Sequence, residues 1–147
     1  MTDIRTYLTD DHRACDEVFA KMEESANKGS AKDAAADFKA FADSMEHHFQ
    51  MEERVLFPEF EQKTGMTQGP TQVMRMEHEQ MRRLIGDISA AVEADDTNRF
   101  FGLSETLMIL IQQHNMKEEQ MLYNMAQQHL APEMERIIAM MDSLIVE

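Results

Sequence analysis

The chain has 147 residues, of which 43% are hydrophobic, and its 28 acidic and 14 basic residues give a net charge of −14. This charge repels the phosphates of nucleic acids and anionic membrane surfaces, so neither is an expected partner. The single cysteine cannot form an internal disulfide. There is neither an apolar run of the roughly 20 residues that span a bilayer nor a signal-peptide pattern, so we expect a cytoplasmic protein.

The composition favours helices. Only five glycines and three prolines occur, and long stretches contain neither of these helix-breaking residues. The length suits one domain covering residues 1–147, large enough to bury a core without disulfides. We therefore predict a single all-α domain.

The first half predicts two helices. Thr9 is a plausible N-cap for a helix over residues 9–26, and a glycine follows that helix. A second helix is expected over residues 30–62, beginning at a serine that can cap it. Pro58 lacks a backbone donor and restricts the residue before it, so we expect a kink or an early end near Phe57.

The second half predicts three more helices. Pro70 suits the first turn of a helix over residues 70–94. The turn that ends at Thr97 supplies an N-cap for a long helix to about residue 129. The inward stripe of that helix is expected to contain Phe100, Leu107, Ile111, His114, Glu118, Met121 and Met125. Residues 132–146 predict a short amphipathic helix that covers one end or side of the domain.

Short connections between four long helices favour antiparallel neighbours. We therefore predict an up-down-up-down four-helix bundle with a short additional C-terminal helix. In this arrangement the first and third helices run parallel to each other, and so do the second and fourth.

The chain contains an internal duplication built on histidine and glutamate. His48 and Glu52 are four residues apart, and His114 and Glu118 repeat this pair 66 residues later. Residues four apart in a helix share one face. His12 and His78 are also 66 residues apart, so the halves are about residues 1–66 and 67–130. We expect these six side chains to face inward at one depth of the bundle.

Six histidine and glutamate ligands suit borderline divalent metals, and the chain lacks the cysteines of a structural zinc site. Six ligands are too many for one tetrahedral ion, so the set predicts two metals. In the simplest arrangement each metal takes two imidazoles, and the glutamates bridge the pair. A purely structural helical protein is the alternative interpretation, because a single inward histidine is often only a core residue.

Other residues near these positions are weaker candidates. Glu53 and Glu119 could accept hydrogen bonds from imidazole N–H groups or face solvent. Cys15 is expected in the core, because Met81 takes the same place in the second half. His47 and His129 are expected outside the ligand set. The 15 methionines are interpreted mainly as flexible core residues, with oxidant scavenging as the alternative.

Together these motifs resemble the hemerythrin-like HHE cation-binding family over residues 7–129. The matching pieces are Asp11-His12-Arg13, the His48 to Glu52 pair with Leu56-Phe57-Pro58, Glu77-His78-Glu79, and the His114 to Glu118 pair. The resemblance implies a four-helix bundle with an oxo- or hydroxo-bridged centre of two Fe ions, for which manganese or zinc could substitute. The implied ligands are His12, His48, Glu52, His78, His114 and Glu118.

The resemblance also points to one branch of the family. Met74 stands where oxygen-carrying hemerythrins have a fifth histidine, and Glu118 stands four residues after His114, where they have an aspartate five residues on. The four-His, two-Glu set is similar to the branch linked to peroxide or nitric oxide chemistry and to the repair of damaged iron centres.

These observations predict a non-haem di-iron protein that reacts with or senses dioxygen, peroxide or nitric oxide, in oxidative or nitrosative stress or in iron-centre repair. The alternative is a module that binds O2 or NO reversibly, or holds iron, without catalytic turnover. The expected partner is a small diatomic or peroxide ligand. A homodimer is compatible with the sequence, which does not decide whether the protein is an enzyme.

Overall fold

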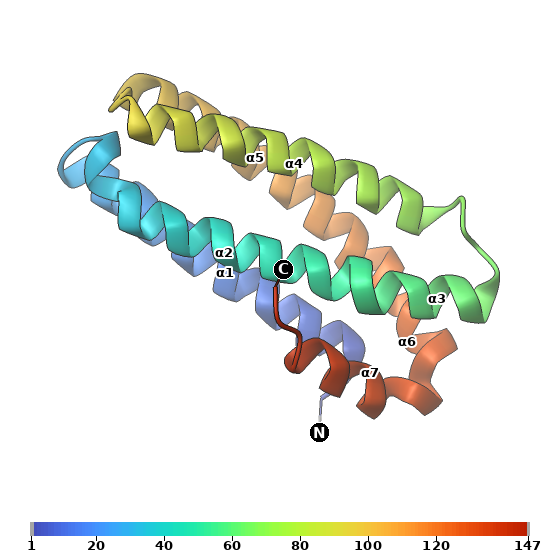
Figure 1. Ribbon diagram of the computed structural model, residues 1–147. Coiled ribbons are helices and arrows are strands. Elements are labelled where there is room, and N and C mark those ends of the chain that lie inside the picture. Colours follow the sequence, from blue (N-terminus) through green and yellow to red (C-terminus); the bar gives the residue numbers. More distant parts are fainter. Residues whose placement is uncertain (1, 147) are drawn as a thin grey trace.

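The computed structural model describes residues 2–146, and this part of the chain is helical with no strand (Figure 1). The α-helices are α1 (Ile4–Lys28), α2 (Ala35–Met51), α3 (Phe57–Thr64), α4 (Pro70–Glu93), α5 (Thr97–Lys117), α6 (Tyr123–Leu130) and α7 (Met134–Asp142). Two short 3₁₀ segments, η1 (Ala31–Ala34) and η4 (Ala131–Glu133), precede α2 and α7. None of the described helices is long and apolar enough to cross a membrane.

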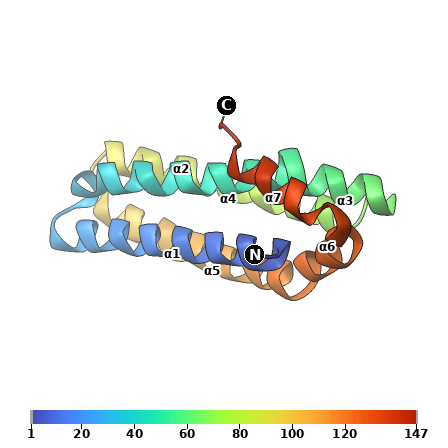
Figure 2. The same ribbon diagram turned by 90° about the horizontal axis from the view of Figure 1, so that it is seen from below.

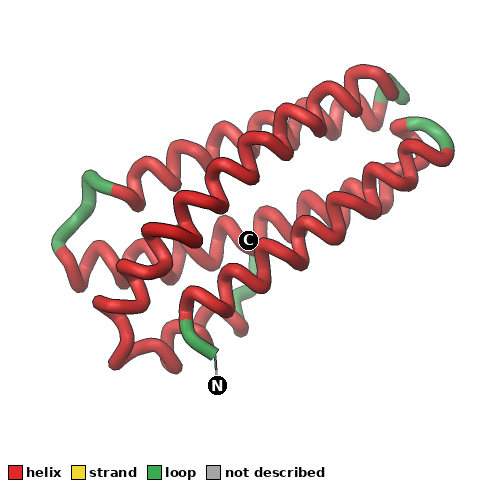
Figure 3. The backbone as a smooth tube through the Cα atoms, turned by 180° about the vertical axis from the view of Figure 1, so that it is seen from behind, coloured by secondary structure: helices red, strands yellow, loops and turns green. Residues whose placement is uncertain are grey.

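The helices form the predicted up-down-up-down bundle. A five-residue π-helical segment, η2 (Glu52–Leu56), joins α2 to α3, and η3 (Glu118–Leu122) joins α5 to α6, so four long helical columns result. α1 packs against α2 and α4 against α5, while α2 contacts α4 and α1 contacts α5 (Figure 2). The connections lie at the ends of the columns (Figure 3). The fold prediction is therefore confirmed.

The first helix begins earlier than predicted. α1 starts at Ile4, and the carboxylate of Asp3 caps it by accepting a hydrogen bond from the backbone N–H of Thr6 at 2.7 Å. The N-cap predicted at Thr9 is wrong, because Thr9 lies inside the helix. An aspartate three residues before a free backbone N–H satisfies the helix end, and the buried Ile4 and Leu8 hold the extra turns on the core.

The early helix end predicted near Phe57 because of Pro58 is wrong. The helical column does not end near Phe57 but continues to Thr64, where Gly65 closes it in the left-handed conformation at φ +74°. The irregularity is the π-helical η2, in which the Phe57 N–H bonds to the Glu52 carbonyl. The same irregularity occurs in η3, which has no proline, so proline is not its cause.

The π-helical segments change which residues face inward. Each adds one residue to a turn and shifts the phase of everything that follows it. Met121, predicted on the inward stripe, is 57% exposed, and Met125 is only partly buried. Leu122 and Tyr123 are buried instead.

The C-terminal helix α7 is shorter than the predicted segment of residues 132–146, since it ends at Asp142 and Ile145 is 81% exposed. Its buried residues Ile137 and Met141 pack with Ile4 and Leu8 of α1. α7 therefore covers the end of the bundle where α1 begins and α3 and α6 lie (Figure 2).

The apolar core has two parts, separated by a polar layer. One cluster contains Phe19, Phe41 and Phe100, and the other contains Phe57 and Phe60. On every long column the inward histidine lies between residues of the two clusters. The metal-site candidates thus lie at one level, enclosed on both sides by close-packed apolar side chains.

Candidate metal centre

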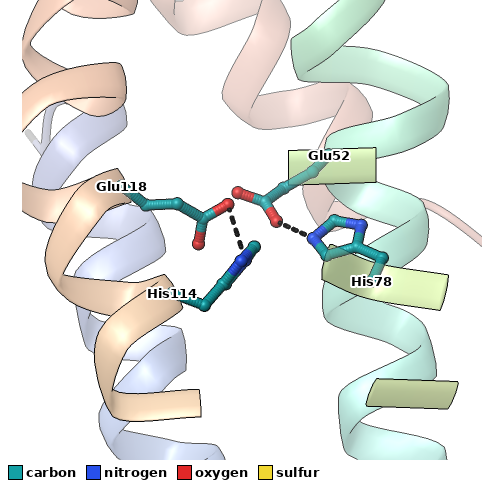
Figure 4. A group of neighbouring side chains, drawn as sticks. All are labelled: Glu52, His78, His114 and Glu118. Atoms are coloured by element: carbon teal, nitrogen blue, oxygen red, sulfur yellow. Dashed lines mark ion pairs between the residues drawn. The ribbon is translucent and has the colours of Figure 1, made fainter. Parts of the chain in front are cut away.

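The structure brings all six predicted ligand residues together in this polar layer. His12 comes from α1, His48 from α2, His78 from α4 and His114 from α5, while Glu52 and Glu118 are the first residues of η2 and η3. All six side chains are buried, the two glutamates completely. Figure 4 shows Glu52 and Glu118 pointing toward each other between His78 and His114.

The inward-facing atoms are close enough to share cations. The Nε2 atoms lie near glutamate oxygens: His78 3.1 Å from Glu52 Oε1, His114 3.2 Å from Glu118 Oε2, His12 3.0 Å from Glu118 Oε1, and His48 3.5 Å from Glu52 Oε1. Two groups have ligand atoms within 4.8 Å of one another: Glu52, His78, His114 and Glu118, and His12, His48 and Glu118. A glutamate common to both groups suits two neighbouring cations.

Each of the four imidazoles has a carboxylate on its other nitrogen. The helices form two hairpins, α1 with α2 and α4 with α5. Within each hairpin, Asp11 accepts a hydrogen bond from His48 Nδ1 at 2.7 Å, and Glu77 accepts one from His114 Nδ1 at 2.8 Å. Between the hairpins, Glu53 lies 2.6 Å from His78 Nδ1 and Glu119 lies 2.7 Å from His12 Nδ1. The pairing is the same in both halves, so the two hairpins exchange equivalent contacts.

The carboxylates have a chemical consequence for the site. When a carboxylate accepts the Nδ1 proton, the neutral imidazole presents the lone pair of Nε2 inward, the form that binds a metal. Glu53 and Glu119 therefore accept hydrogen bonds from imidazole N–H groups and do not simply face solvent. Asp11 and Glu77 were not predicted in this role, although each directly precedes a ligand histidine.

Half of the inward atoms have no hydrogen-bond partner among the described residues. They are the buried atoms Glu52 Oε1, Glu118 Oε2, His78 Nε2 and His114 Nε2. Leaving buried polar atoms without a partner is costly, and lone pairs that face each other need a positive charge between them. The residues present therefore fit a bound divalent cation.

The pKa shifts of the site histidines indicate the same shortage of positive charge. Burial opposes protonation of His48, but the charge of Glu52 and the hydrogen bond to Asp11 outweigh it and raise the pKa of His48 to about 9. The pKa of His78 rises to about 9 for similar reasons, against burial and with Glu52 and Glu53 as partners. Metal binds the neutral imidazole, so metal binding must compete with the protonation that these raised pKa values favour.

The two glutamates differ as acids. Burial and the nearby charge of Glu118 raise the pKa of Glu52. Burial also acts against ionisation of Glu118. The charge of His114 and the hydrogen bonds that Glu118 accepts nevertheless hold the pKa of Glu118 well below its ordinary value. Two facing buried carboxylates ionise one at a time unless a cation neutralises both.

A tyrosine not predicted for the site also reaches it. The hydroxyl oxygen of the fully buried Tyr123 lies 2.8 Å from Glu52 Oε2 and 2.9 Å from Glu118 Oε1. It also lies 3.0 Å from His12 Nε2 and 3.4 Å from His48 Nε2. The sequence analysis missed Tyr123 because a regular helix that places Glu118 inward would turn Tyr123 away from the site. The available signal was the 66-residue repeat, which gives Tyr123 an aromatic counterpart, Phe57, in the first half.

The remaining candidates lie outside the ligand set. Cys15 is buried and lines a small cavity next to the imidazoles together with Met81, as its core assignment predicted. Burial raises the pKa of the Cys15 thiol to about 12, so this thiol is not activated as a nucleophile. His129 is exposed and His47 partly buried.

A helical bundle with a buried layer of imidazoles and carboxylates defines a metal-binding protein of the four-helix class. The family model of the hemerythrin HHE cation-binding domain matches residues 3–126. The chain belongs to this family. Comparisons with curated proteins and with solved structures gave no match.

Proposed function

We propose that this protein is a non-haem di-iron protein that binds and reacts with dioxygen, peroxide or nitric oxide. Two iron ions would be held by His12, His48, Glu52, His78, His114 and Glu118. The observation that carries the proposal is the set of buried inward lone pairs, backed by a carboxylate on every imidazole. When bound, iron supplies redox chemistry and coordination positions for a small ligand.

The surroundings of the site favour a very small ligand. A nearly enclosed cavity of about 10 Å3, room for roughly one water-sized molecule, adjoins the imidazoles. Its walls include His12, His48 and His114 and the side chains of Cys15, Met45 and Met81. A mostly apolar cavity of this size selects diatomic molecules or peroxide over larger substrates.

The protein's own residues orient the ligands and exclude water. Asp11, Glu53, Glu77 and Glu119 fix the ring orientation of the imidazoles, and the two apolar clusters close the layer from both sides. Such a rigid, closed site holds a bound small molecule away from bulk solvent.

The first experiment is elemental analysis of the purified protein after anaerobic iron loading, with visible spectra before and after exposure to O2. Two irons per chain and a spectral change on oxidation support the proposal. His114→Ala should lose metal, while His129→Ala, an exposed histidine outside the site, should keep it. Absence of metal above trace level would refute it. Loading with manganese or zinc tests whether the native site is selective.

The alternative function is reversible O2 or NO binding, or iron holding, without turnover. Stopped-flow mixing of the reduced di-iron protein with substoichiometric and then excess peroxide separates the two. Continued consumption of peroxide supports an enzyme, whereas one oxidation without further consumption supports the binding module. A cytoplasmic role in oxidative or nitrosative stress or in iron-centre repair, and a homodimeric state, belong to the same proposal.

A further inference from the structure

The eight inward-facing donor atoms of the site divide into two sets that differ in one respect. Four of them, Glu52 Oε1, Glu118 Oε2, His78 Nε2 and His114 Nε2, have no hydrogen-bond partner in the part of the chain that the structure describes. The other four, Glu52 Oε2, Glu118 Oε1, His12 Nε2 and His48 Nε2, all lie within 3.4 Å of the hydroxyl oxygen of Tyr123. One phenol oxygen therefore lies at the centre of one half of the site, and the other half has nothing equivalent.

The duplication shows that this difference is not a general property of the fold. Tyr123 follows Glu118 by five residues, and Phe57 follows Glu52 by five residues. Both rings stack on a ligand imidazole, Tyr123 on His12 at 5.5 Å between centroids and Phe57 on His78 at 5.8 Å. The two rings take equivalent places, but only Tyr123 carries a hydroxyl.

The hydroxyl of Tyr123 is held firmly in this position. The side chain is fully buried, and the π-helical η3 turns it inward at the first residue of α6. Its one proton can satisfy only one of the four surrounding acceptor atoms at a time. With the imidazoles neutral, the other lone pairs point at the same hydroxyl oxygen without receiving a proton from it, and such a set of oxygen and nitrogen atoms suits a cation.

We propose that Tyr123 is an additional metal ligand that makes the two halves of the centre unequal. This inference rests on the proposed di-iron function. The phenol oxygen would join His12 and His48 at one iron and give up its proton to solvent on binding, while the iron at His78 and His114 lacks such a ligand. Tyrosinate is a known oxygen ligand of ferric iron in proteins.

The unequal halves have a functional consequence. An anionic oxygen ligand favours Fe(III) over Fe(II), so the iron at His12 and His48 is the harder one to reduce. It also occupies a coordination position there. Small ligands should therefore bind at the iron held by His78 and His114, on the side of the small cavity that His114 lines.

The test uses the iron-loaded protein in three forms: wild type, Tyr123→Phe and Tyr7→Phe. Tyr7 is the only other tyrosine, and its hydroxyl bonds to Asp142 outside the site. After iron loading and oxidation with O2, we expect a visible phenolate-to-Fe(III) charge-transfer band in wild type and Tyr7→Phe, and its loss in Tyr123→Phe. Binding of one of the two metals should weaken about tenfold or more in Tyr123→Phe, while the other is unchanged.

Resonance Raman spectra of the wild-type protein with ring-deuterated tyrosine give a second readout that does not depend on a variant. Isotope-shifted tyrosinate modes support the inference. Two irons per chain without such modes overturn it and leave the di-iron function standing. One iron in wild type but two in Tyr123→Phe would show that the hydroxyl blocks the site, which also overturns it. No iron in any form refutes both proposals.

Discussion

Asp11 tests whether the carboxylates behind the imidazoles contribute to metal binding. Its Oδ2 accepts from His48 Nδ1 at 2.7 Å, and its side chain is 30% exposed. Asp11→Asn keeps an oxygen that can accept this hydrogen bond but removes the charge that makes the imidazole more basic. Loss of such a partner typically weakens metal affinity 10- to 100-fold. Because Asp11 is partly screened by solvent, we expect about tenfold, which equals about 1.4 kcal/mol.

The assay is competition between the protein and a chelator for Co2+ or, without oxygen, for Fe2+. Asp10→Asn is the matched control, because it removes the same charge from the neighbouring residue. Asp10 is 64% exposed and pairs with Arg13 on the surface. Equal affinities for Asp11→Asn and wild type, or an equal loss in both variants, would show that the hydrogen-bonded carboxylate has no specific role.

Three further predictions concern stability. Metal at 100 times its Kd should stabilise the folded protein by about 2.7 kcal/mol, which corresponds to a rise of about 5–10 °C in the melting temperature measured by calorimetry. An unchanged melting temperature would show that the metal does not bind the folded protein preferentially. Phe41→Ala, in the apolar cluster, should cost about 3–5 kcal/mol in urea unfolding while metal content stays the same; a cost below about 1 kcal/mol would mean that this ring is not packed as described. Burial and the bond to Asp142 raise the pKa of Tyr7 from 10.0 to about 12. The folded state holds the Tyr7 proton more tightly, so the contribution of this hydroxyl to the free energy of unfolding is complete below pH 10 and is lost as the pH rises through 12. Tyr7→Phe should therefore lose less stability at alkaline pH than wild type. Identical pH profiles of stability for the two proteins would contradict this prediction.

The fold could be predicted from the sequence because its signals are local and repeated. Apolar residues at helical spacing and short connections were enough for the bundle, and the 66-residue offset selected the six inward histidines and glutamates. The helix start at Ile4 was missed because Thr9 and Asp3 can both cap a helix, and burial of Ile4 and Leu8 decides between them.

The π-helical segments could not be predicted from periodicity. A regular helix places Met121 inward, but η3 adds a residue and places Leu122 and Tyr123 there instead. Such a segment loses regular backbone bonding and persists where tertiary contacts compensate for it. Here it begins at both site glutamates, Glu52 and Glu118.

The sequence by itself determined the family, the four columns and the residues that meet in the polar layer, because these follow from spacing along each helix. Only the tertiary structure decided which partner each imidazole has, since Glu119 and His12 are 107 positions apart in the chain. It also decided that the hydroxyl of Tyr123 enters one half of the site. Contacts between distant segments depend on how the hairpins dock, and spacing within one helix carries no information about that docking.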